Sequence, residues 1–218
     1  MSSLLDPALE RALELDAQHF KTTQLPIVTV SGTFREDLKG YFAMPEDESI
    51  SDVVFSRAHY SMAVALAVQA WGSKMDPDKA WVVDPTNYVS AQDWNRILLT
   101  QTICQTIARV SLLKRVKDFI DRYGRSKLPI LSSITPPLLH LTQGLTKPIL
   151  SLHIAAGNIL AAQGHRVVQV ITDPHVREEY LTHADLKTMI FCVFDENTKT
   201  EFLEKAAINH IAADPQRV

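Results

Sequence analysis

The second half of the chain alternates short apolar segments with helical ones, and this alternation limits the possible folds more than any other feature. From residue 149 the segments are "ILSLH", "IAAGNILAAQG", "HRVVQVITD", "HVREEYLTHA", "TMIFCVFD" and "ENTKTEFLEKAAI". Apolar runs of roughly four to six residues, each followed by a helical segment of about ten, are typical of right-handed βαβ crossovers. Such crossovers build a parallel sheet that is buried on both faces. The sequence therefore predicts an α/β fold, a Rossmann-like parallel sheet with helices on both faces.

The first half is predicted to contribute, in order, a helix at 5–20, a strand at 26–34, a strand at 53–55 with a helix after it, a strand within 79–88 and a long helix from Trp94 to about Tyr123. The prolines of residues 128–148 predict a wandering segment rather than one element. We divide the chain into an N-terminal helix and strand extension, 1–50, and a main domain, 51–218. Whether the extension caps that domain or joins its sheet stays open.

Polar residues follow the predicted strands, at the edge where parallel sheets bind ligands. They are Arg57 and His59, Asp84 and Asn87, His153 and Asn158, Asp173 and His175, and Asp195. For single residues, capping or solvation is the simpler explanation, because Asp84, Thr172 and Asp195 all suit helix N-caps. Taken together, however, these residues favour a polar cleft.

Several classes of function lack their sequence signals. The chain has no G-x-G-x-x-G, no Walker A segment, no G-x-S-x-G and no H-E-x-x-H, so nothing indicates a cofactor or a metal. The net charge of −3, from 22 basic and 25 acidic residues, argues against nucleic-acid binding by bulk electrostatics.

The remaining bulk features indicate a cytoplasmic protein. The first residues, "MSSLLDPALERALELD", are acidic and amphipathic and do not resemble a signal peptide. No run of about 18 apolar residues is present. Cys104 and Cys192 are isolated from each other in the sequence and are predicted to be buried free thiols.

The order of these pieces resembles the N-terminal half of a GT-B glycosyltransferase, and most of all the group of monogalactosyldiacylglycerol synthase and the peptidoglycan N-acetylglucosaminyltransferase. "FSRAHYSMAVALAVQA" stands where that group has a glycine-rich loop ending in histidine and then a small-residue helix, so His59 matches the family histidine. "AWVVDPTN", "GHRVVQVITDPHVREEY" and "MIFCVFDENTKTEFLEKAAINHIAADPQRV" resemble later strands and helices. The resemblance covers roughly residues 50 to 218.

The resemblance implies transfer of a sugar from a nucleotide donor to an acceptor held by residues 51–218. His59 would be the catalytic base, because the ordinary pKa of histidine lies near neutrality. Asp173 would be the second catalytic residue, as acceptor ligand or as the carboxylate that orients a histidine. The residues expected to bind the acceptor are Arg57, Asp84, Asn87, His153, Asn158 and His175. The alternative for His59 is a helix-end residue bonded to a loop carbonyl, and for His153 and His175 a structural role is the simpler one.

The resemblance also implies partners. The UDP-sugar would be held by a C-terminal domain that this chain lacks or by a partner chain, so the polypeptide alone is expected to be inactive. A lipid or small molecule is the expected acceptor, and a lipid acceptor would bring the protein to a membrane surface. The basic amphipathic residues 95–127 and the segment 128–148 are the candidates for that contact, with core packing as the alternative.

One departure from the family supports other hypotheses. Phe55, Ser56, Arg57 and Ala58 replace the glycines that precede the family histidine, and bulky residues cannot approach a diphosphate as closely as glycines can. This favours a non-catalytic interaction subunit of a split transferase. A Rossmann-like domain that binds an unrelated small ligand is the third hypothesis.

Overall fold

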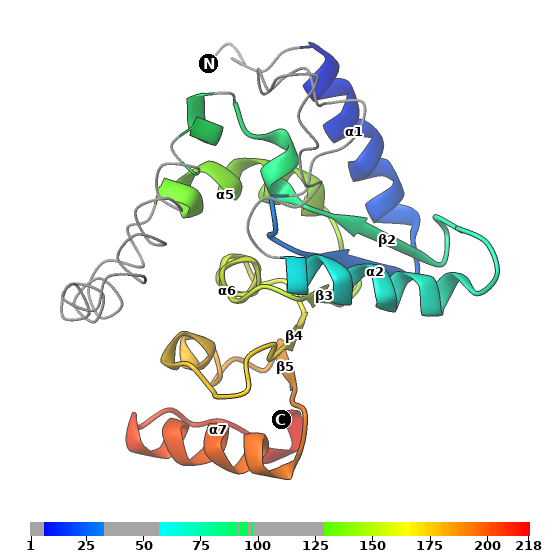
Figure 1. Cartoon of the computed structure of the whole chain (residues 1–218). Helices are drawn as coiled ribbons and strands as arrows, with labels where there is room; N and C mark the ends of the chain where they lie inside the picture. The colour runs from blue at the N-terminus through cyan, green and yellow to red at the C-terminus, as the bar shows by residue number, and fades with distance from the viewer. Residues whose placement is uncertain (1–6, 33–56, 91, 96, 98–128) are drawn as a thin grey trace.

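A parallel sheet of five strands lies at the centre of the computed structural model, which describes residues 7–32, 57–90, 92–95, 97 and 129–218 (Figure 1). The strands are β1 Leu25–Val28, β2 Ala80–Val83, β3 Ile149–Ser151, β4 Val167–Val170 and β5 Met189–Cys192. Their order across the sheet is β2-β1-β3-β4-β5, and every pair is parallel. The predicted α/β, Rossmann-like fold is confirmed.

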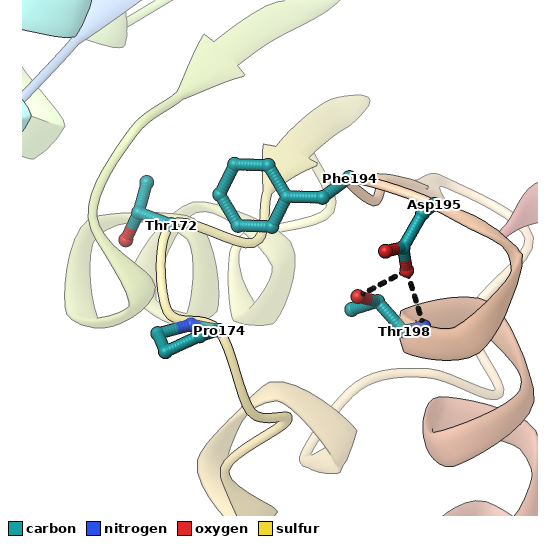
Figure 2. A pocket seen from close by; sticks show the side chains of 5 residues that line it. All are labelled: Thr172, Pro174, Phe194, Asp195 and Thr198. Atoms are coloured by element: carbon teal, nitrogen blue, oxygen red, sulfur yellow. Dashed lines mark hydrogen bonds between the residues drawn. The ribbon is translucent and has the colours of Figure 1, made fainter.

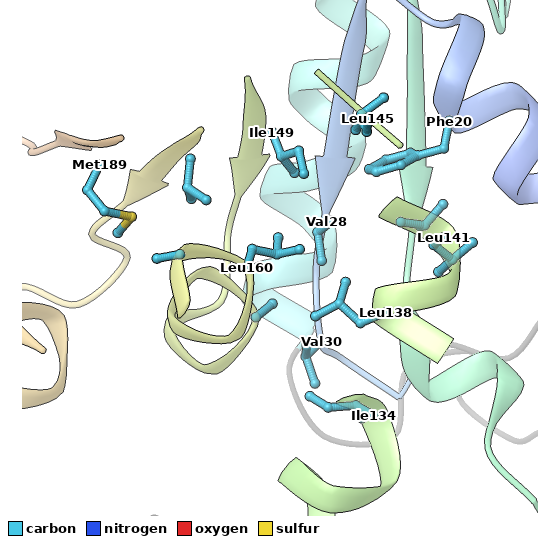
Figure 3. Close-up of a cluster of buried hydrophobic side chains, with 14 of the residues drawn as sticks. Phe20, Val28, Val30, Ile134, Leu138, Leu141, Leu145, Ile149, Leu160 and Met189 are labelled. Carbon is cyan, nitrogen blue, oxygen red and sulfur yellow. The ribbon is translucent and has the colours of Figure 1, made fainter. Parts of the chain in front are cut away.

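Helices pack on both faces of this sheet. They are α1 Pro7–Thr22, α2 Arg57–Trp71, α5 Pro129–Thr142, α6 Ile154–Ala162 and α7 Glu196–Ile208. Neighbouring residues of β1 point to opposite faces, as the pleat requires. Ile27 packs with Ala63 and Ala67 of α2, whose small side chains bring that helix close to the sheet. Val28 belongs to the larger cluster on the other face, to which α1, α5, α6 and α7 contribute (Figure 3).

The strand β1 lies inside the sheet, and this answers the question that the sequence left open about the N-terminal extension. β1 pairs with β2 along one side and with β3 along the other. It is shorter than predicted, ending at Val28, although the N–H of Thr29 still donates to the carbonyl of Val83 at 3.0 Å. Residues 25–28 are thus an integral part of the sheet that carries the rest of the domain.

The prediction of a wandering segment at 128–148 is wrong, because α5 runs through most of it with Pro136 and Pro137 inside the helix. Two interior prolines remove two backbone donors and cost on the order of 3 kcal/mol each. Ile134, Leu138 and Leu141 recur at helical spacing and are fully buried, and each such burial contributes roughly 1.5–3 kcal/mol. Tertiary packing therefore outweighs the local cost, and these side chains lie in the core rather than at a lipid surface.

The prediction of a helix for "HVREEYLTHA" is also wrong. The only helical element in that stretch is the short 3-10 helix η5, Glu178–Leu181. In an α-helix the backbone carbonyls of this stretch would accept hydrogen bonds from backbone N–H groups. Here two of them accept from side chains of neighbouring helices. Asn158 of α6 donates to the carbonyl of Glu179 at 2.9 Å, and Lys205 of α7 donates to the carbonyl of Val176 at 2.5 Å.

Several predictions concern residues that the structure does not describe. The strand at 53–55, Cys104 and most of the long helix from Trp94 lie outside the described ranges, although residues 92–95 and 97 are helical. Cys192 is a free thiol as predicted, but it is exposed rather than buried, because no described helix covers that face of β5. No helix of the described residues is long and apolar enough to cross a membrane.

Candidate functional site

The carboxyl edge of the sheet brings together His59, His153 and Thr172, which come from three separate elements. His59 lies in the first turn of α2, His153 directly precedes α6, and Thr172 follows the end of β4. His59 Nε2 lies 2.8 Å from the Thr172 hydroxyl. The two imidazole rings meet edge to face, with centroids 5.2 Å apart and an interplanar angle of 82°. The two histidines thus share one site.

A polar network continues from Thr172 toward the solvent. The Tyr180 hydroxyl accepts from the backbone N–H of Thr172 at 3.3 Å and lies 3.4 Å from the Thr172 hydroxyl. It donates to Asp173 Oδ2 at 3.3 Å. The other oxygen of Asp173 accepts from Arg177 at 2.6 Å. A charged pair therefore fixes the outer end of a network that begins at His59.

Burial and nearby charge keep both imidazoles neutral. Desolvation lowers the pKa of His59, an effect that Asp173 opposes and Arg177 reinforces. Desolvation, with added repulsion from His59 and Arg177, lowers the pKa of His153 to about 3. Burial raises the pKa of the Tyr180 hydroxyl, which keeps it protonated. At neutral pH His59 therefore retains a lone pair that can accept a proton.

His153 also has a structural role. Its Nδ1 accepts the backbone N–H of Ala155 at 3.2 Å, so the side chain caps the N-terminus of α6. A nitrogen that accepts a hydrogen bond carries no proton, so the neutral ring is protonated at Nε2. His153 thus faces His59 as a fixed, uncharged ring.

An open pocket of about 350 Å³ lies beside this network, between the ends of β4 and β5. Its lining residues are Thr172, Pro174, Phe194, Asp195 and Thr198. Figure 2 shows the Phe194 ring extending toward Thr172, with Asp195 and Thr198 on the far side. Thr172 belongs both to the pocket and to the hydrogen bond with His59. A ligand in the pocket would therefore lie next to the His59 network.

Asp84 and Asn87 lie at the end of β2, in a buried structural arrangement. Asp84 Oδ2 accepts from the N–H and hydroxyl of Ser31 at 3.0 and 2.7 Å, and Oδ1 accepts from the same groups of Thr86 at 3.0 and 2.6 Å. This carboxylate ties the end of β1 to the turn after β2. Asn87 is also buried, and its Oδ1 has no hydrogen-bond partner among the described residues.

The other predicted acceptor ligands are distributed around the network. Asn158 binds the backbone of η5, as described above. The side chain of His175 is 85% exposed, and its Nδ1 lies 3.8 Å from a carboxylate oxygen of Glu201 in α7. Arg57 is exposed at the start of α2.

Sequence reasoning missed Tyr180 and Phe194 and gave Thr172 only a capping role. Tyr180 is 1% exposed and looked like part of a helix face, because its segment was predicted to be helical. Phe194 belongs to an apolar strand pattern, which indicates core packing. The one usable signal is position: both follow β4 or β5 on the chain, where a parallel sheet places its ligands.

The described residues contain no group of three His, Cys, Asp or Glu side chains that could hold a metal ion. No family model, curated protein or solved structure matches the chain. The arrangement itself therefore carries the functional argument: a neutral histidine, its hydrogen-bonded network and an adjoining pocket at the carboxyl edge of an α/β sheet.

The lowered pKa of His153 predicts a loss of stability in acid. The unfolded chain binds a proton near pH 6.5, whereas the folded His153 resists it down to about pH 3. The contribution of the neutral His153 to the free energy of unfolding is thus fully present above about pH 6.5. It falls as the pH drops, by about 2 kcal/mol between pH 7 and pH 5. In urea unfolding at both pH values, His153→Asn, which preserves a capping oxygen, should reduce this loss. Equal losses in the two proteins would contradict the assignment.

Proposed function

We propose that the chain is the acceptor-binding half of a nucleotide-sugar-dependent glycosyltransferase that acts on a lipid acceptor. The proposal rests on one observation: Thr172 both lines the pocket and bonds to the neutral His59. An acceptor hydroxyl bound there would lie next to Thr172, one hydrogen bond away from the imidazole that would take its proton. The order of strands and helices that resembles a GT-B N-terminal half supports the same function.

In this proposal His59 acts as the general base. The acceptor oxygen attacks the anomeric carbon of the donor sugar while the proton of its hydroxyl passes to the imidazole. The bond from that carbon to the nucleotide breaks, and the nucleoside diphosphate leaves with the electron pair. A positioned base contributes about 10²–10⁴-fold to such a step. The donor is held by another domain or by a partner chain.

The pocket suits the head of an acceptor better than its chains. Phe194 and Pro174 offer apolar surface, while Asp195 and the two threonines offer polar groups. Asp195 Oδ1 already accepts from the N–H and hydroxyl of Thr198, at 2.8 Å each, so the carboxylate is held in place. A volume of about 350 Å³ is at the small end of ligand pockets, so the pocket has room for the head of an acceptor and not for its chains.

Acceptor binding can be tested on the chain itself. We would titrate the protein with dioctanoylglycerol in detergent micelles and follow amide NMR shifts, with empty micelles as the blank. The shifts should cluster at Thr172, Phe194 and Thr198. Phe194→Ala should weaken binding several-fold, whereas Ile208→Ala, which truncates another exposed apolar residue at the far end of α7, should not.

Other outcomes of that titration favour the alternatives. Shifts with free UDP-sugars but none with dioctanoylglycerol would indicate a small-ligand-binding domain. No shift with any of these compounds would remove the support for an acceptor site. The interaction-subunit hypothesis would then be tested by whether the protein isolated from its natural source carries a transferase chain with it.

A further inference from the structure

We infer that the pocket between the ends of β4 and β5 holds an uncharged sugar ring at the head of the acceptor, and that Asp195 excludes phosphorylated heads from it. The inference rests on the proposed function and specifies its acceptor as a neutral glycolipid. Three features of the pocket carry it: the polar atoms that face a ligand, the charges around them and the exposed ring of Phe194.

The polar atoms of Asp195 and Thr198 in the pocket accept hydrogen bonds from a ligand. Asp195 Oδ1 accepts from the N–H and the hydroxyl of Thr198 at 2.8 Å each, and Figure 2 shows the second oxygen of Asp195 turned toward the pocket. Because the Thr198 hydroxyl directs its proton to Asp195, its oxygen can only accept from a ligand. Sugar hydroxyls can donate to both oxygens, whereas a doubly ionised phosphate has no proton to donate.

The charge at this end of α7 opposes an anion. The N-terminus of a helix usually attracts phosphate, but here the carboxylate of Asp195 already occupies that position as the N-cap. The hydrogen bonds from Thr198 lower the pKa of Asp195, so this carboxyl group is ionised at neutral pH. Glu196 adds a second carboxylate in the first turn of the helix.

The basic side chains of the loop after β4 are paired with other carboxylates. Arg177 donates to Asp173 at 2.6 Å, and His175 Nδ1 lies 3.8 Å from a carboxylate oxygen of Glu201. None of the described residues that line the pocket is basic. A phosphate in the pocket would therefore face the carboxylate of Asp195 without a cation among these lining residues, and such a contact between like charges is unfavourable.

The ring of Phe194 favours a sugar ring over the open chain of glycerol. Phe194 is 59% exposed, and its ring extends toward Thr172 (Figure 2). The face of an aromatic ring carries partial negative charge, so it attracts the slightly positive C–H groups on one face of a pyranose. Covering Phe194 with that face also removes apolar surface from water. Glycerol has no comparable flat face.

The experiment compares the methyl α-glycosides of glucose and galactose with the 1-phosphates of the same sugars, by amide NMR shifts of the chain. Each pair shares one sugar ring and differs in charge. The glycosides should shift the signals of Phe194 and Thr198. At low ionic strength, where charges are screened least, the 1-phosphates should bind at least about tenfold more weakly. Free glycerol should bind more weakly than the glycosides.

Asp195→Asn removes the charge and keeps the helix cap, since asparagine is as good an N-cap as aspartate. In this variant the affinities for each glycoside and its 1-phosphate should come within about threefold of each other. The matched control is Asp214→Asn. Asp214 also has a lowered pKa and caps the 3-10 helix η6, Pro215–Arg217, but it does not line the pocket. This variant should retain the wild-type difference.

Three results would overturn the inference: no shift with either glycoside, equal affinities of the wild type for the glycosides and the 1-phosphates, or a difference that Asp195→Asn leaves unchanged. Shifts with tetramethylammonium in place of the glycosides would also overturn it, because a carboxylate beside an aromatic ring would then serve a cationic head.

Failure of the proposed function is a separate result. If the glycosides bind as expected but no glycolipid accepts sugar in the presence of the donor-binding domain or partner, the pocket remains a site for neutral sugars and the proposed function is rejected. Sugar transfer to a lipid acceptor without binding of the glycosides would retain the proposed function and reject the present inference.

Discussion

Gly157→Ala is expected to lower the free energy of unfolding by about 2–4 kcal/mol, although alanine is the better helix former by about 1 kcal/mol. A Cβ at this position would lie 1.8 Å from Gln169 Oε1 and 3.3 Å from Ser151 Oγ. Gln169 is 1% exposed and cannot turn out to solvent. It would lose its hydrogen bonds to the carbonyls of Ser151 and Val170, at 3.2 and 2.9 Å, and each buried polar group left unpaired costs about 1–3 kcal/mol.

A double-mutant cycle with Gln169→Ala isolates this contact. In the Gln169→Ala background only the 3.3 Å approach to Ser151 Oγ remains, so adding Gly157→Ala should be close to neutral or stabilising by up to about 1 kcal/mol. Gly164→Ala offers a second comparison. An added Cβ there would meet no atom within 4 Å, so only the strain of the positive φ of +81° remains. We expect this strain to cost about 1 kcal/mol. A loss from Gly157→Ala that is the same in both backgrounds would show that Gln169 is not the cause.

Under the proposed function, His59→Gln is expected to lower the rate of sugar transfer by about 10²–10⁴-fold when the chain acts together with its donor-binding domain or partner. Glutamine keeps a polar group near the Thr172 hydroxyl but cannot accept a proton at neutral pH. Because desolvation lowers the pKa of His59, the wild-type rate should stay constant from neutral pH down to below the ordinary histidine pKa. The measurement is release of UDP from UDP-sugars, by the protein together with its donor-binding domain or partner.

The matched control for this variant is His165→Gln, which changes a partly buried histidine at the amino end of β4. It should leave the rate within about twofold of the wild type, because it lies far from the carboxyl edge. If His59→Gln transferred sugar as fast as the wild type, the base would have to lie elsewhere.

The strands that carry the site could be predicted because their signal is local. β3, β4 and β5 lie in short, mostly apolar runs, and each precedes a change of pattern that marks the end of the strand. Once the sheet is parallel, His59, His153 and Asp173 must lie at one edge. Their common location therefore followed from the sequence, as did the free thiol of Cys192.

The errors arose where tertiary contacts override local preference. Pro136 and Pro137 argue against a helix, but Ile134 and Leu138 bury enough apolar surface to keep α5 continuous. The segment after β4 has helical spacing, but side chains from α6 and α7 bind its carbonyls and leave one short 3-10 turn. No single segment contains the information on these competing partners.

The sequence by itself determined the class of sheet, the edge that holds the polar residues and the place of His59 at the start of a helix, since these depend on spacing along one segment. Only the tertiary structure decided that Asp84 binds Ser31 and Thr86, that Thr172 bonds to His59 rather than capping a helix, and that Tyr180 joins it to Asp173. These contacts join residues from separate elements, and hydrogen bonds form only where the packing of those elements brings a donor within about 3 Å of an acceptor.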